Sequence, residues 1–268
     1  MLLRGASAEA LEVLTEKVGS GLNQADTAAT ADQLFSVAVL LRADASIRRV
    51  VTDSSLETAA KQGLVQQLFG SKLDQGALDV LLAAAERRWV ASVDLPAALE
   101  RLSEIALAKS VGAKSDQLVD ELFATAQAIA TDLELRDALS NPGRTVEDRA
   151  QLAEKIFGAN ALPATVTLVK QALAGTYGTI SAALETYREV VAEVRGESVA
   201  TVRVVKPLAD ADREKLRAAL SKQYGRPVHL NEIIDPSVMG GVRVEIADDV
   251  IDGTVVNRLD EARRRLAG

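Results

Sequence analysis

The sequence contains no cysteine and only one histidine, His229. The absence of cysteine excludes disulfides, thiol chemistry and cysteine-ligated metal sites. A single histidine also excludes a histidine-cluster metal site and argues against a Ser-His-Asp site. Because His229 alternates with the apolar Val228 and Leu230, we expect it on the solvated face of a strand. The sequence therefore predicts no catalytic residue, no metal and no cofactor.

Aromatic residues are scarce, at 3% of the chain, although 48% of the residues are hydrophobic. The core must therefore be built from Leu, Val, Ile and Ala, which suits close-packed helices. Near the start of the chain the longest apolar run, Val37 to Leu41, is far too short for a membrane span. Met1-Leu2-Leu3-Arg4 leads into an amphipathic segment without a signal-peptide core. We expect a cytoplasmic chain that reaches a membrane only through a partner.

Net positive charge is also lacking, because the chain carries −7 at neutral pH. This argues against a general phosphate-backbone binder, so no nucleic-acid partner is expected. Residues 197–268 hold 12 basic and 12 acidic residues, so they are neutral. Residues 1–196, with 19 basic and 26 acidic residues, carry the whole negative charge.

The acidic part repeats itself at an offset of 88 residues. Leu34-Phe35 returns as Leu122-Phe123, and Trp89 is matched by Tyr177. The register holds without a gap over ~80 positions, which indicates a duplicated structural unit. The matched pairs include Leu11/Leu99, Glu12/Glu100, Leu14/Leu102, Glu16/Glu104, Ala38/Ala126, Leu41/Ile129, Ile47/Leu135 and Leu64/Leu152.

Each unit has the pattern of a helical bundle. Leu34, Ala38 and Leu41 share a face at helical spacing, as do their counterparts. Asp44 and Asp132 are expected to cap short helices. Phe69-Gly70 and Phe157-Gly158 are expected to end helices, with Gly as a C-terminal residue. Residues 95–109 finish the first unit and match the start of the second, so we expect one helix to bridge two bundles.

After residue 196 the pattern changes to a small α/β unit. Residues 198–206 predict a strand, residues 210–224 an amphipathic helix, and Val228 opens another strand. Asp235-Pro236 and Gly240-Gly241 precede a strand over residues 242–246. Asp252-Gly253 marks a tight turn after a short strand near Val250, and Thr254 is expected to cap a closing helix.

This last motif has an alternative chemical interpretation. Gly240-Gly241 could cradle a phosphate, but no Lys-Ser/Thr pair follows, and the next element is a strand rather than a helix. Asp252 could be a catalytic carboxylate, but an Asp before Gly is far more often part of a turn. We therefore predict that Asp235, Pro236, Gly240, Gly241, Asp252 and Gly253 specify the fold.

The same residues resemble the C-terminal signature of the delta subunit of rotary ATP synthases, the family of the mitochondrial oligomycin-sensitivity-conferring protein. One position departs from the pattern, since Ala247 stands where the family usually has a small turn residue such as Gly. The usual member has one helical bundle, whereas the duplication here is similar to actinobacterial members. The matching residues are Ile234, Asp235, Pro236, Val238, Gly240, Gly241, Val242, Val244, Val250, Ile251, Asp252, Gly253 and Arg258.

The resemblance implies a non-catalytic subunit of the proton-translocating ATP synthase. It would lie in the peripheral stalk at the cytoplasmic face of the membrane, join the catalytic head to the membrane sector and resist rotor torque. The fold expected is mainly α with a C-terminal α+β domain: bundles over residues 1–108 and 109–195, then a sheet-plus-helix domain over residues 196–268. The expected partners are the N-terminal helix of the alpha subunit and the C-terminal end of the b subunit.

The bundles are expected to take the helix of the alpha subunit, because they carry the negative charge and offer grooves between amphipathic helices. The first bundle is favoured, since its starting helix, residues 8–18, is free at the chain end. The neutral C-terminal domain, with its closing helix over residues 254–266, is expected to take the b subunit.

Two other classes of function remain open at this stage. A helical-repeat adaptor of another complex is one, although two repeats are few for a solenoid. A KH-like nucleic-acid binder is the other, but its GXXG loop is missing because Gly225 is followed by Arg226, Pro227 and Val228.

Overall fold

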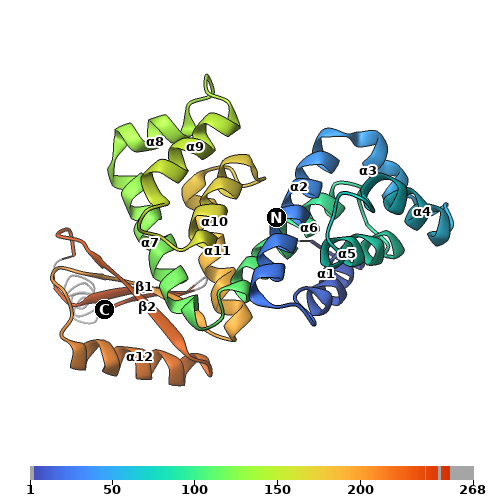
Figure 1. Ribbon diagram of the computed structural model, residues 1–268. Helices are drawn as coiled ribbons and strands as arrows, with labels where there is room; N and C mark the ends of the chain where they lie inside the picture. Colours follow the sequence, from blue (N-terminus) through green and yellow to red (C-terminus); the bar gives the residue numbers. More distant parts are fainter. Residues whose placement is uncertain (1–2, 239, 247–248, 254–268) are drawn as a thin grey trace, which may run out of the picture. The chain divides into compact units, whose positions relative to one another are not determined.

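The computed structural model describes residues 3–238, 240–246 and 249–253. These residues form twelve α-helices, one short 3-10 helix and a four-stranded sheet (Figure 1). The expected class, mainly helical with a C-terminal sheet-plus-helix domain, is confirmed. The chain divides into two compact units, residues 1–191 and 192–268. The finer division into bundles at residues 1–108 and 109–195 stays a prediction.

The first unit begins with the first bundle, which we define as α1 to α6. Side chains cap several of these helices: Asn23 accepts a hydrogen bond from the Asp26 amide, and Asp44 accepts from the Ser46 and Ile47 amides. Such caps satisfy amides that a helix leaves without partners. The helices are α1 (Ala6–Lys17), α2 (Gln24–Ala43), α3 (Ala45–Thr52), α4 (Thr58–Phe69), α5 (Gln75–Glu86) and α6 (Asp94–Ser110).

The second bundle, α6 to α11, reproduces the first at the offset seen in the sequence. Shifting α3, α4 and α5 by 88 residues gives the bounds of α8, α9 and α10 without adjustment. Asp132 caps α8 as Asp44 caps α3, as predicted. The further elements are η1 (Gly112–Lys114), α7 (Ser115–Thr131), α8 (Leu133–Ser140), α9 (Val146–Phe157), α10 (Pro163–Ala174) and α11 (Ile180–Arg195).

The helix α6 is shared by the two bundles, as the sequence predicted. It packs along α2 and against α1 and α10. Apolar side chains such as Leu95, Leu99 and Leu102 are fully buried in it, and the charged Glu100 and Glu104 are buried as well. A helix buried on most of its circumference lies in the centre of its unit.

The burial of matched positions agrees at some pairs of the repeat and differs at others. Leu34 and Leu122 are both fully buried, and Trp89 and Tyr177 are both half-buried. Phe69 is buried, whereas Phe157 is only half-buried. Phe69 and Phe157 end α4 and α9 as expected.

Gly70 and Gly158 follow these helices as their C-terminal residues, as expected, but not in the left-handed conformation common at such caps. Gly70 and Gly158 have φ of −60° and −64°, in the right-handed region. These positions therefore do not require glycine for a positive φ, since any L-residue adopts such backbone angles.

The second unit is a mixed sheet in the order β2-β1-β3-β4. β2 is parallel to β1 and is reached through α12, whereas β3 pairs antiparallel with β1 and β4. Ala200, Val202, Val244 and Leu220 lie in its core, which joins the sheet to α12. The elements are β1 (Ser198–Val204), α12 (Asp210–Tyr224), β2 (Val228–Ile234), β3 (Val242–Ile246) and β4 (Asp249–Asp252). The predicted helix from Thr254, the position of Ala247 and the motif residue Arg258 lie outside the described residues.

Candidate interaction surfaces

The predicted motif residues lie at one end of β3. Asp235 begins the turn after β2, and its side chain accepts hydrogen bonds from the amide and hydroxyl of Ser237 at 2.9 and 2.6 Å. These bonds hold the pKa of Asp235 below its ordinary value. Pro236 follows within the same turn. The turn is thus closed locally by a side chain, as Asp favours.

Gly240 and Gly241 both have positive φ, 74° and 80°. An L-residue with a side chain is strained in that region. Gly253 lies near them in space, because its amide donates to the Val242 carbonyl at 2.9 Å. Asp252 ends β4 opposite Arg243 in the ladder. The motif residues therefore lie together at the start of β3. This geometry supports their fold-specifying role, which stays a prediction.

The face of the sheet opposite α12 is polar. Arg203 and Arg243 both contact the Glu245 carboxylate, at 3.5 and 3.3 Å, and Arg203 lies 4.0 Å from Asp235. His229 lies on this face because Val228 and Leu230 pack toward the core. It is half-buried rather than fully solvated as expected.

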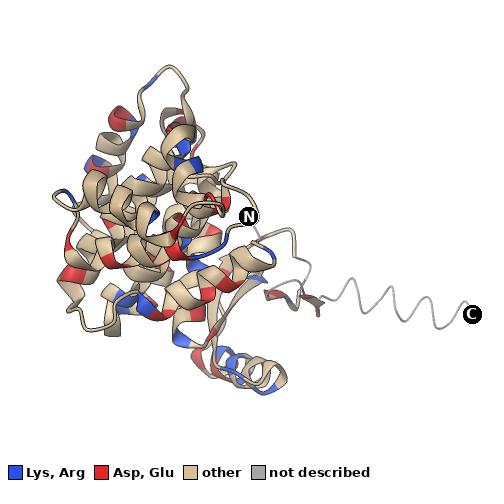
Figure 2. Cartoon of the chain, turned by 90° about the vertical axis from the view of Figure 1, so that its right-hand side faces the viewer, with Lys and Arg blue, Asp and Glu red and all other residues tan. Residues whose placement is uncertain are grey.

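The first bundle exposes most of the large apolar side chains. Of twelve such exposed residues among the described ones, seven lie in this bundle: Val13, Val39, Leu40, Val50, Leu56, Val90 and Val93. Acidic and basic residues are interspersed along the helices (Figure 2). Val13 is 39% exposed and lies one turn before Glu16 and Lys17 on the same face of α1.

A groove of about 460 Å³ continues from that face of α1. Glu16 and Lys17 line it from α1, Thr30 from α2, and Asp79 and Val80 from α5. The groove thus lies between α1, α2 and α5, and it is lined by two apolar side chains, Leu22 and Val80, and by the carboxylates of Glu16 and Asp79.

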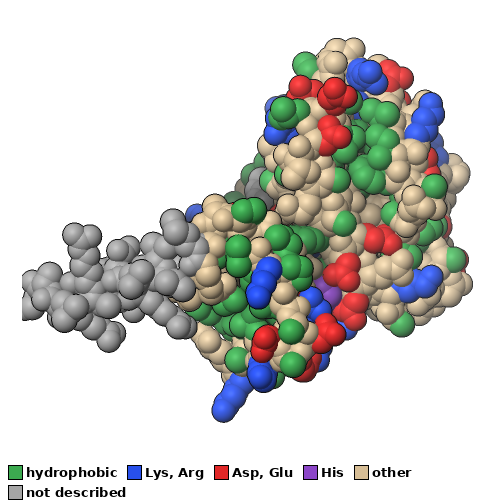
Figure 3. Space-filling view, turned by 90° about the vertical axis from the view of Figure 1, so that its left-hand side faces the viewer, with side chains coloured by type: hydrophobic (Ala, Val, Ile, Leu, Met, Phe, Trp, Pro, Cys, Tyr) green, Lys and Arg blue, Asp and Glu red, His purple; other side chains and the backbone are tan. Residues whose placement is uncertain are grey.

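The second bundle has a different surface at the matching positions. Its first helix is α6, where Glu100 and Glu104 are 2% and 1% exposed, whereas the matching Glu12 and Glu16 of α1 are exposed. The large apolar side chains exposed in the described residues of this bundle are Leu133 and Ile156. Figure 3, which views the left-hand side of Figure 1, shows apolar side chains at the surface.

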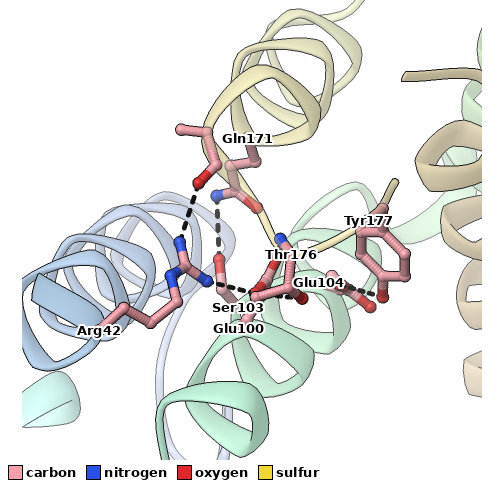
Figure 4. A network of polar contacts seen from close by, with 8 residues as sticks. Arg42, Glu100, Ser103, Glu104, Gln171, Thr176 and Tyr177 are labelled. Carbon is pink, nitrogen blue, oxygen red and sulfur yellow. Dashed lines mark hydrogen bonds and ion pairs between the residues drawn. The ribbon is translucent and has the colours of Figure 1, made fainter. Parts of the chain in front are cut away.

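A polar network explains the burial of the two glutamates in α6 (Figure 4). Arg42 of α2 donates to the Glu100 carboxylate and, at 2.9 Å, to the Ala174 carbonyl at the end of α10. Thr176 donates to Glu100 from its amide and hydroxyl at 2.9 and 3.0 Å. Gln171 donates to the Ser103 hydroxyl at 2.9 Å. Residues of both bundles are thus bonded to one carboxylate.

Glu104 is the second buried carboxylate of the network. It accepts hydrogen bonds from the Tyr177 hydroxyl at 2.8 Å and from Arg101 at 3.2 Å. Burial raises the pKa of Glu104 to about 7, despite the nearby Arg101. Desolvation prevails because the Arg101 side chain is 27% exposed, so solvent screens its charge.

The described residues contain no group of three or more His, Cys, Asp or Glu side chains that could hold a metal. Among the same residues, no helix is long and apolar enough to cross a membrane.

Comparison with known proteins identifies the family. The model of the family "ATP synthase delta (OSCP) subunit" matches residues 100–266. The ATP synthase subunit delta of Nocardioides sp. is 52% identical over 268 residues, covering 99% of this chain and 98% of its own. The chain belongs to the ATP synthase delta (OSCP) subunit family. Its family is non-catalytic and serves ATP synthesis and proton transport.

Other relatives of the delta family are also similar over nearly their full length. The subunit delta of Streptomyces coelicolor is 37% identical, covering 99% of this chain and 98% of its own. That of Thermobifida fusca is 34% identical, covering 99% and 100%. The actinobacterial long form predicted from the duplicated bundle is thus confirmed. The family model begins inside α6, so it corresponds to the second bundle and the C-terminal unit.

The network between the bundles was not predicted from the sequence. One signal was available, since Glu100 and Glu104 are charged residues in a helix expected to have a bundle on each side. Arg42, the partner of Glu100, gave no signal, because the matching position of the repeat is Ala130.

Proposed function

We propose that the chain joins the catalytic head of an F-type ATP synthase to the b subunit of the peripheral stalk and holds the head against rotor torque. The observation that carries the proposal is the groove between α1, α2 and α5, with the exposed Val13 beside it, on a delta-family scaffold. A packed helical unit of this kind transmits force without chemistry. Through the complex, it would be held at the cytoplasmic face of the membrane.

The N-terminal helix of the alpha subunit is assigned to the first bundle. An amphipathic helix buries its apolar face in a groove between helices, with charged residues at the rim. Val13 and the groove beside Glu16 and Asp79 offer such a site. Basic residues at the edge of the incoming helix would gain from the two carboxylates.

The internal repeat supports this assignment. In the second bundle the matching face of α6 is covered, since Arg42 of α2 bonds to Glu100 and to the end of α10. In the first bundle the matching Glu12 and Glu16 of α1 are exposed. The face that the chain covers in one bundle is free for a partner in the other.

The C-terminal end of the b subunit is assigned to the C-terminal unit. Residues 197–268 are neutral, unlike the acidic helical part. The sheet face with Arg203, Arg243 and Glu245 offers paired charges of both signs, which suits a partner that is itself mixed in charge.

Binding of the full chain to purified catalytic head tests the first assignment. Val13→Asp places a charge in the apolar contact, so we expect the Kd to rise at least about tenfold, a loss of about 1.4 kcal/mol. Leu133→Asp, at an exposed apolar site of the second bundle, is the matched control and should leave the Kd unchanged.

The second bundle is the alternative site for the helix of the alpha subunit. It is favoured by the family model, which begins at residue 100. In that case Leu133→Asp would weaken binding and Val13→Asp would not.

Two fragments of the chain test the two partner assignments separately. Residues 1–195 should bind the catalytic head but not a C-terminal peptide of the b subunit, and residues 196–268 should do the reverse. Capture of the head by residues 196–268 alone would contradict the assignment of both partners. Binding of neither partner by the full chain would instead favour a helical adaptor of another complex.

A further inference from the structure

Two carboxylates of α6 hold the segment that joins α10 to α11. Glu100 accepts from the amide and hydroxyl of Thr176, and Glu104 accepts from the hydroxyl of Tyr177. The two glutamates are one turn apart, so they contact adjacent residues of the segment (Figure 4). This segment closes the second bundle onto the shared helix.

The surroundings of Glu104 supply few compensating charges. The ionisable groups that act on Glu104 are Glu100 and Arg101 from α6 and Tyr177 from the joining segment, and the charge of Glu104 in turn acts on Tyr187 of α11. Glu100 is already paired with Arg42. Tyr187 is buried, and its hydroxyl has no hydrogen-bond partner among the described residues. Ionised Glu104 therefore adds a second negative charge to a buried site.

We propose that Glu104 is a proton-controlled latch between α6 and residues 174–179. When its carboxyl group carries a proton, the segment stays closed on α6, and loss of the proton favours release of the segment. The contact between residues 174–179 and α6 therefore opens more often as pH rises toward neutrality.

The direction follows from linkage between proton binding and opening. In the closed state burial raises the pKa of Glu104 to about 7, whereas in an opened, solvated state the carboxyl returns toward its ordinary value. The closed state thus binds the proton more tightly. Between those two values the opening equilibrium gains about tenfold for each unit of pH, and above neutrality it levels off.

The matching residues of the first bundle do not form such a latch. Glu16, the counterpart of Glu104, is exposed, and Trp89, the counterpart of Tyr177, donates from its indole nitrogen to the Ala84 carbonyl at 3.0 Å instead. The device is therefore specific to the junction of the bundles, and it goes beyond the proposed stalk function without depending on it.

Amide hydrogen exchange of the full chain, resolved over residues 174–179, tests the proposal. Protection factors, corrected for the intrinsic pH dependence of exchange, should fall about 40-fold between pH 5 and pH 7 and only about twofold further by pH 8.5. Glu104→Gln keeps the shape of the side chain but cannot ionise, so its protection should not vary over this range. Glu16→Gln, the matched variant of the first repeat, should behave like the wild type.

Tyr177→Phe provides a second variant in case Glu104→Gln does not fold. It removes a donor to the carboxylate, so the fall in protection should end at higher pH than in the wild type. Wild-type protection that is flat with pH would overturn the proposal. So would a fall of the same size in Glu104→Gln.

Discussion

Glu16 and Glu104 show how one residue of a repeat takes on two physical roles. In α1 the side chain is exposed, whereas in α6 it is 1% exposed and bonded to Tyr177 and Arg101. The difference comes from the neighbours, because only α6 has a helical bundle on each side. An exposed carboxylate keeps its hydration when it ionises, whereas a buried one loses it at a cost in free energy.

The free energy of unfolding should depend on pH through Glu104. Its folded pKa of about 7 lies above the ordinary 4.5, so its contribution is fully present below pH 4.5 and is lost as pH rises through 7. The loss is about 3 kcal/mol at most, from the size of the shift. Urea unfolding at several pH values measures it.

The free energy of unfolding is measured over the same pH values for the wild type, Glu104→Gln and Glu16→Gln. Glu104→Gln should remove this part of the pH dependence, and Glu16→Gln should leave it unchanged. Equal slopes for all three proteins between pH 5 and 7 would contradict the assignment.

Gly240 and Gly241 carry a second prediction at the residue scale. Because both have positive φ, Gly→Val at either position should destabilise the second unit by ~1–3 kcal/mol and leave the helical unit folded. Gly178→Val is the control, since no positive φ is recorded there and no atom lies within 4 Å of an added Cβ. Thermal melts followed by circular dichroism separate these outcomes.

At the scale of elements, α6 completes both bundles. Its residues Leu99 and Leu102 are both 0% accessible to solvent. A fragment of residues 111–268 lacks α6 and should lose the helical content of α7 to α11, whereas residues 94–268 should keep it. Far-ultraviolet circular dichroism of the two fragments tests this, and equal helicity per residue would show that α6 is dispensable.

Arg42 gives a further prediction for the contact between α2 and α10. Arg42→Ala leaves Glu100 buried without its cation, so we expect a loss of about 2–4 kcal/mol in unfolding free energy. Arg49→Ala, at an exposed position of α3, should change it by less than about 0.5 kcal/mol. Urea unfolding at pH 7 compares the two.

The sequence predicted the elements better than the contacts between them. Residues 210–224 form the predicted helix, and the offset of 88 residues reproduces α8, α9 and α10. These features depend on local periodicity and on caps such as Asp44 and Asp132, which act on residues close to them in the chain. The bond from Arg42 to Glu100 joins residues 58 apart, and no local pattern records such a pairing.

Some expectations about surfaces were also incomplete. The sequence indicated that α1 would be free, but the exposure of Val90 and Val93 and the groove beside Asp79 required the packed structure. His229 was expected to be solvated and is half-buried, because burial of a strand face depends on what packs against it.

At the scale of the whole molecule, the two units should unfold separately. Residues 1–191 and 192–268 form distinct compact units, and the bundles of the first share α6. Calorimetry of the full chain should therefore show one transition for both bundles and another for the sheet unit. Residues 1–195 alone should retain the first transition, and two transitions in that fragment would show that the bundles unfold independently.

The sharing of α6 also has an evolutionary consequence. A substitution in α1 has to satisfy one bundle, whereas a substitution at the matching position of α6 has to satisfy two. Drift along the lineage should therefore be slower in α6, so that Glu104 and Leu99 vary less among long-form relatives than Glu16 and Leu11. The duplication that lengthened this chain would thus have fixed the very helix at which the copies meet.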